Sequence, residues 1–62
     1  MLYRTTFFDG DMAFNARPLS ITREIKEGES YRYDGFDYKI TKIEKLCLHL
    51  TLLEAKEQSD DT

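Results

Sequence analysis

The stretch from residue 30 to residue 40 holds an Asp-Gly pair, Asp34-Gly35, between two runs that alternate aromatic and polar residues. A two-residue type I′ turn needs positive φ at both central positions, and Asp-Gly adopts that conformation at low steric cost. The predicted opposed pairs are Tyr33–Phe36, Arg32–Asp37, Tyr31–Tyr38 and Ser30–Lys39. Directly opposed residues point to the same face of a sheet. The stretch therefore predicts a β-hairpin with one aromatic face and one charged face.

A second Asp-Gly pair, Asp9-Gly10, predicts another hairpin over residues 2–16. With these two residues as the loop, one face is mostly apolar. Its members are Tyr3, Thr5, Phe7, Met12, Phe14 and Ala16. Phe8 points away from this face, so it is either an exposed contact for a partner or part of a second layer. The alternative loop, Gly10-Asp11, would place Thr6 beside Phe8 and is less favourable.

Pro18 lacks a backbone donor and belongs at a sheet edge or a strand break. The second strand is therefore expected to end at Ala16 or Arg17. Residues 19–26 alternate apolar and polar and predict a further strand, with a short helix over residues 20–26 as the alternative. Residues 27–29 surround Gly28 and predict a third glycine turn.

Alternation resumes from Phe36 to Ile40 and slips at Lys42, which indicates a β-bulge near residues 41–43. Residues 46–52 place four leucines on one face and predict a half-buried strand. With Lys42 opposite Leu46, the leucine row extends the aromatic face of the central hairpin. The alternative is a C-terminal helix, because Leu46, Leu50 and Leu53 also fit a helical stripe and residues 52–58 favour helix.

These elements predict a mainly β domain over residues 1–56. The favoured architecture is a small antiparallel meander of five or six strands that closes into an SH3-like barrel. The alternative is a bent antiparallel sheet with one C-terminal helix. Residues 57–62 are an acidic segment that we expect to be disordered.

The formal net charge of −3 is unevenly distributed. Residues 54–62 account for −3 by themselves, whereas residues 1–53 hold eight acidic and eight basic residues. A near-neutral domain argues against strong non-specific binding to nucleic acid, but a local basic patch stays open. Lys39 belongs to the solvent-facing side of its strand, and Lys42 joins it only if the bulge turns Lys42 to that side.

The chain has one cysteine, Cys47, and one histidine, His49. A single cysteine forms no internal disulfide, and cysteine-based metal sites need several more ligands, so a cytoplasmic protein without a cofactor is expected. Residues two apart on a strand stand roughly 6–7 Å apart, which is too far for a Cys–His catalytic pair. No apolar run is long enough for a transmembrane helix. We therefore expect no enzymatic activity and no membrane insertion.

The function that these features favour is a non-catalytic protein–protein interaction module whose partner is another protein or a second copy of the chain. In size and acidity it is like the small accessory proteins of phages and mobile elements, of the inhibitor or connector type. The alternative is a small barrel that binds single-stranded nucleic acid. The candidate partner-binding residues are Phe8, Lys39 and Lys42.

Overall fold

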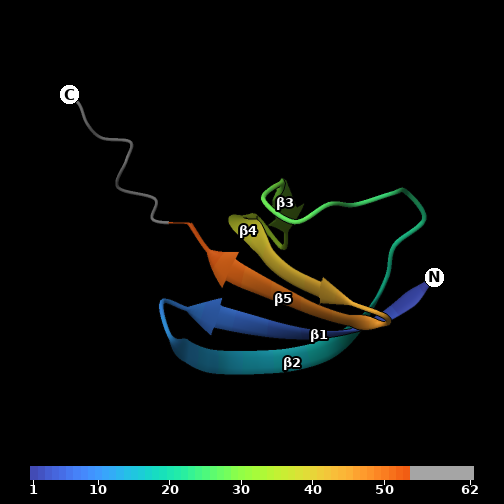
Figure 1. Cartoon of the computed structure of the whole chain (residues 1–62). Coiled ribbons are helices and arrows are strands. Elements are labelled where there is room, and N and C mark those ends of the chain that lie inside the picture. The colour runs from blue at the N-terminus through green and yellow to red at the C-terminus, as the bar shows by residue number, and fades with distance from the viewer. Residues whose placement is uncertain (54–62) are drawn as a thin grey trace.

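The computed structural model describes residues 1–53, which form one curled sheet of five strands without a helix (Figure 1). The strands are β1 (Leu2–Asp9), β2 (Met12–Ser20), β3 (Ser30–Tyr33), β4 (Phe36–Glu44) and β5 (Cys47–Leu52). Their order across the sheet is β2-β1-β5-β4-β3. The curl makes a half-barrel, so the predicted small, mainly β, barrel-like fold is confirmed.

One pairing differs from an all-antiparallel sheet: β1 and β5 run parallel, while the other three neighbouring pairs are antiparallel. The parallel register places Thr5 beside Leu48 and Phe7 beside Leu50. All four residues are buried. The chain thus brings its two most deeply buried strands together at the centre of the sheet, which a simple meander would have kept at its ends.

The hairpin at Asp34-Gly35 has the predicted register, from Tyr33 opposite Phe36 to Ser30 opposite Lys39. Asp34 has φ 53° and Gly35 has φ 84°, the two positive values that a type I′ turn requires. Arg32 and Asp37 form the predicted charged pair, with 3.1 Å between Nη1 and Oδ1.

The register predicted for the first hairpin is wrong. Asp9 pairs with Met12, so the loop is Gly10-Asp11, and a β-bulge at Phe14 restores the phase beyond it. Of the two loop residues only Gly10 has positive φ, at 65°, which is the requirement of a type II′ turn. The bulge absorbs one residue of β2, while Thr6 and Phe8, two residues apart on β1, still share one face of the sheet.

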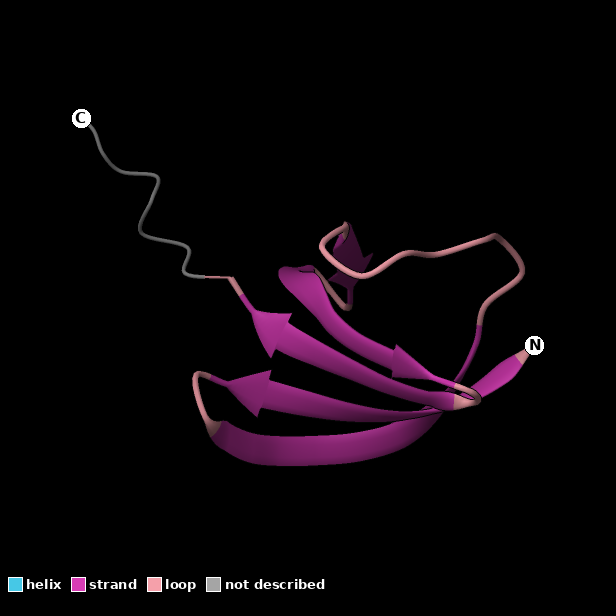
Figure 2. Cartoon of the chain, viewed as in Figure 1, coloured by secondary structure: helices cyan, strands magenta, loops and turns pink. Residues whose placement is uncertain are grey.

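The strand predicted over residues 19–26 is also wrong. β2 runs through Pro18 to Ser20, because as an edge strand it does not need the missing N–H of proline. Residues 21–29 then form a long loop that arches from β2 to β3 (Figure 2). Ile21 and Ile25 from this loop are buried in the core. The alternating apolar residues that suggested a strand are therefore two loop residues that contact the core. The glycine turn is confirmed, with Gly28 at φ 92°.

The bulge predicted near residues 41–43 is confirmed: the β4–β5 register shifts between Ile40 and Lys42. The predicted strand at the end of the chain is confirmed as β5. Leu46 lies in the preceding turn beside Lys45, which has φ 56°, so the pairing slides by two residues and Ile43 faces Leu48. A shift of two residues preserves the face, and Leu48 and Leu50 are fully buried as expected.

The core lies inside the curl of the sheet. Its buried apolar residues are Phe7, Leu19, Ile21, Ile25, Tyr38, Ile40, Leu48 and Leu50. The predicted domain boundary at residue 56 and the acidic segment 57–62 lie outside the described residues, as does most of the alternative helix. Nothing in residues 1–53 is a helix of the length and hydropathy needed to cross a membrane.

Candidate functional site

The three residues predicted to bind a partner, Phe8, Lys39 and Lys42, lie on one surface, the outer face of the sheet. Phe8 pairs with Thr51 of β5, and Thr51 pairs with Lys39 of β4. One step along β5, His49 pairs with Lys42. The bulge at Thr41 is what places Lys42 on the same face as Lys39, because Lys39 and Lys42 oppose residues two apart on β5.

Phe8 is half-buried and packs against His49, with ring centroids 4.9 Å apart and the planes inclined by 47°. The two rings come from adjacent parallel strands, β1 and β5. The place of His49 beside Phe8 depends on the parallel β1–β5 pairing, which the sequence did not reveal. On the outer face, these two rings lie side by side and their neighbours are polar residues.

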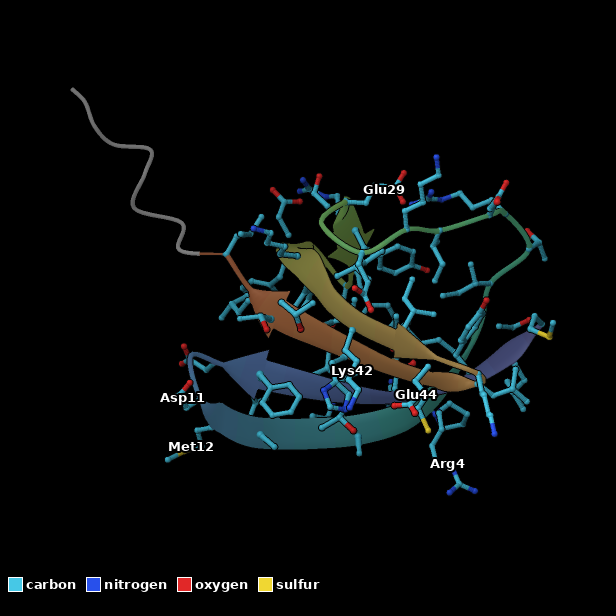
Figure 3. All side chains as sticks on the ribbon, viewed as in Figure 1. Arg4, Asp11, Met12, Glu29, Lys42 and Glu44 are labelled. Atoms are coloured by element: carbon cyan, nitrogen blue, oxygen red, sulfur yellow. The ribbon has the colours of Figure 1, made fainter. Side chains whose placement is uncertain are left out.

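The outer face is basic. Four basic residues on it are Arg4, Arg32, Lys39 and Lys42, against the acidic Asp37 and Glu44. Figure 3 shows Arg4, Lys42 and Glu44 projecting from this side of the sheet. Since residues 1–53 hold equal numbers of acidic and basic residues, a face of charge +2 leaves −2 on the rest of the described chain. The net charge of residues 1–53 is therefore zero, with positive charge concentrated on the outer face and negative charge on the rest.

Two of the four cations are already paired on this face. Arg32 contacts Asp37 at 3.1 Å, and Lys42 Nζ lies 3.4 Å from Glu44 Oε1. Among residues 1–53, Arg4 and Lys39 have no such carboxylate contact. These two cations stand at opposite ends of the face, Arg4 on β1 and Lys39 on β4, with His49 of β5 between their strands.

A hollow of about 580 Å³ adjoins Arg4 at one end of the sheet. Its walls include Leu2, Pro18, Leu46 and the exposed Cys47. The lining is chiefly apolar. Cys47 and His49 share the outer face, but the imidazole packs on Phe8, and among residues 1–53 no hydrogen bond joins it to the thiol. No group of three possible metal ligands occurs within the described residues.

A second exposed surface lies at the open end of the half-barrel, where aromatic rings surround buried Phe7. Phe14 lies 6.3 Å from the Phe7 centroid and Tyr33 lies 5.3 Å from it. Phe36 is the cross-strand neighbour of Tyr33. Phe14 and Phe36 are 51% and 57% exposed, although both belong to the apolar and aromatic faces predicted for the two hairpins. We call Phe14, Tyr33 and Phe36 the open-end patch.

The two edge strands of the sheet approach each other beside this patch. Arg17 of β2 donates a hydrogen bond from Nη1 to the Tyr33 hydroxyl of β3 at 2.7 Å. This hydrogen bond, followed by the electrostatic effect of Tyr33, raises the pKa of Arg17 above its ordinary value. The half-barrel is thus joined across its seam by side chains instead of by a backbone ladder.

The free edge of β2 is poorly suited to pairing with another strand. The N–H of Arg4 donates to Leu46 O, so the opposed Pro18 directs its backbone toward the free edge. Ala16, two residues away, has the same orientation, and its N–H donates to its neighbour Asn15 Oδ1 at 2.9 Å. At Pro18 there is therefore no outward N–H donor, and the outward N–H of Ala16 is already hydrogen-bonded. Both features protect an edge strand from pairing with another strand.

No family model matches the chain, and the searches of curated proteins and of solved structures returned no match either. The SH3-like architecture within the barrel-like class therefore stays a prediction.

Proposed function

We propose that the chain is a non-catalytic protein–protein interaction module that associates through the open-end patch, and that a second copy of the chain occupies it. The observation that supports this proposal is the exposure of Phe14, whose ring lies 6.3 Å from that of buried Phe7, and of Phe36, the cross-strand neighbour of Tyr33. A chain of 62 residues buries a small core, and association is a common way for such chains to cover apolar surface.

The arrangement favours a two-fold pair. In a two-fold interface residue i of one copy meets residue j of the other, and j meets i. Phe14 comes from β2 and Phe36 from the start of β4, so each copy offers one ring on each rim of the open end. The rims also carry opposite charges, because Arg17 stands on β2 and Asp34 in the turn between β3 and β4.

The blocked β2 edge argues that side chains, rather than an added strand, make this contact. Pro18 and the Asn15–Ala16 hydrogen bond interrupt the outward donors of β2. β3, the opposite edge strand, has only four residues, and short edge strands offer few ladder hydrogen bonds.

Directed cross-linking tests the proposal. In a Cys47→Ser background, the Phe14→Cys chain is mixed with the Phe36→Cys chain under mild oxidation. The two-fold arrangement predicts that the mixed disulfide dimer exceeds either self-linked dimer. Met12→Cys provides the control, since Met12 is 71% exposed and points out from the β1–β2 turn (Figure 3). Equal cross-linking of all mixtures would mean random collision and would contradict the proposal.

The exposed Cys47 thiol supports a reducing, cytoplasmic location. The kinship with small phage or mobile-element accessory proteins, whether inhibitors or connectors, stays an analogy of size and acidity.

A further inference from the structure

We infer that the outer face of the sheet is a second binding site, for a short stretch of single-stranded nucleic acid. The site consists of the Phe8–His49 ring pair, with Lys39 and Lys42 beside it on β4 and Arg4 four residues before Phe8 on β1. It is separate from the open-end patch, which lies on the inner side of the sheet.

The ring pair supplies a surface for base stacking. Phe8 and His49 are both half-buried, so the sheet fixes their orientation while part of each ring remains in solvent. Proteins that bind single strands stack bases on such aromatic side chains, and stacking tolerates any base.

The cations follow the same path as the rings. Along β5 the opposed rows are Phe8–Thr51–Lys39, then Thr6–His49–Lys42, then Arg4–Cys47–Glu44. The first and last rows lie four residues apart, about 13 Å at the usual strand rise. A strand laid along β5 would therefore meet a cation in each row, and in the last row also Glu44, which pairs with Lys42. Arg4 and Lys39 have no ion-pair partner among residues 1–53.

The charge distribution favours a polyanion on this face only. The outer face carries +2, while the rest of the described chain carries −2 and would repel phosphate. Because the net charge of residues 1–53 is zero, non-specific affinity for nucleic acid is limited. Binding is expected to be weak and strongly dependent on salt. The apolar hollow beside Arg4 leaves space for one more base at the end of the path.

The test uses the full chain and a fluorescein-labelled oligothymidylate of about 12 nucleotides, a typical site size for a small barrel. Fluorescence anisotropy is expected to show saturable binding that weakens roughly 20-fold between about 50 and 200 mM salt, the dependence expected for three phosphate contacts to a single strand. No binding at the lower salt concentration would overturn the inference.

Two charge-matched variants locate the site. Lys39→Glu is expected to weaken binding about tenfold, since it reverses one phosphate contact. Lys26→Glu makes the same change of charge in the 21–29 loop, away from the outer face, and is expected to change affinity less than about twofold. Equal losses in both variants would mean that net charge alone governs binding, and would overturn the assignment.

A third variant separates stacking from attraction to any polyanion. Phe8→Leu is expected to weaken oligothymidylate binding about tenfold, while binding of heparin, which has no bases, stays unchanged. Equal losses for both ligands would overturn the stacking role, as would no loss for either. As a readout independent of stability, Phe8→Trp fluorescence is expected to be quenched by the oligonucleotide and not by heparin.

A polyglutamate peptide is the remaining comparison. If it binds the outer face more tightly than the oligonucleotide does, the face serves an acidic protein segment and the inference is wrong. Phe14→Ser leaves this face intact, so loss of self-association in that variant without loss of oligonucleotide binding distinguishes the two proposals.

Discussion

Arg17 of β2 hydrogen-bonds the Tyr33 hydroxyl of β3 at 2.7 Å, although these two strands stand at opposite edges of the sheet. The contact shows how far the sheet curls: its first and last strands meet through side chains, with Phe7 beneath Tyr33. A backbone ladder at this seam would have closed a barrel. Among residues 1–53 this hydrogen bond is the one that joins β2 to β3, and Phe14 and Phe36 remain exposed.

Tyr38 should make the fold sensitive to alkaline pH. Burial, followed by the charges of Asp34 and Tyr33, raises the pKa of Tyr38 above its ordinary value of 10.0. Below that pH both states keep the proton. Above it the unfolded tyrosine ionises first, so the free energy of unfolding falls as pH rises toward the folded pKa. Urea unfolding above pH 10 should show a shallower fall for Tyr38→Phe; an unchanged slope would contradict this assignment.

Thr5 is a polar residue with no exposed surface at the centre of the core. Its hydroxyl has a contact to Tyr3 O at 3.3 Å, which is long for a hydroxyl hydrogen bond. Thr5→Val is expected to raise the free energy of unfolding by about 0.5–1 kcal/mol, since it removes a poorly satisfied buried hydroxyl. Urea denaturation measures the change, and a loss of stability would show that the hydroxyl is well bonded.

Gly35 tests the type I′ turn. Its φ of 84° is unfavourable for any residue with a Cβ, and no atom lies within 4 Å of an added Cβ, so the cost is purely that of the backbone. Gly35→Ala should lower the free energy of unfolding by about 1–2 kcal/mol. Gly35→Asn should lower it less, because asparagine tolerates this conformation. Equal losses in the two variants would contradict a backbone origin.

The protection of the β2 edge can be removed. The double variant Asn15→Ala and Pro18→Val frees the Ala16 N–H and adds a donor at position 18, which restores two consecutive outward donors. We expect faster aggregation with thioflavin T binding on mild heating. The control is Thr22→Ala, an exposed change in the adjacent loop. Identical aggregation rates in both proteins would mean that the edge is protected in some other way.

Local turn chemistry made part of this fold predictable. Asp34-Gly35 determined the register of its hairpin, and the slip at Lys42 located the bulge at Thr41. At Asp9-Gly10 the same dipeptide misled, because Gly10 occupies the first turn position and the bulge at Phe14 has no local signature. Similarly, Ile21 and Ile25 belong to a run that alternates as a strand would, but they lie in a loop and are buried in the core.

The candidate sites depend on contacts between distant segments, which is why the sequence predicted them incompletely. Phe8, Lys39 and Lys42 were identified one by one, but their common face follows from the parallel β1–β5 pairing. That pairing also brings His49 to Phe8. The open-end patch was missed because alternation assigns Phe14 and Phe36 to the inner face without showing that the sheet stays open there.

The mass of the chain in solution is the most direct test of self-association through the open-end patch. Light scattering behind size exclusion, over a dilution series, should give a dimer at high concentration that dissociates on dilution. The double variant Phe14→Ser and Phe36→Ser should remain monomeric at every concentration, while Met12→Ser should behave like the unchanged chain. A wild-type monomer throughout the series, or a dimer that survives in the double variant, would contradict the proposed role of the patch.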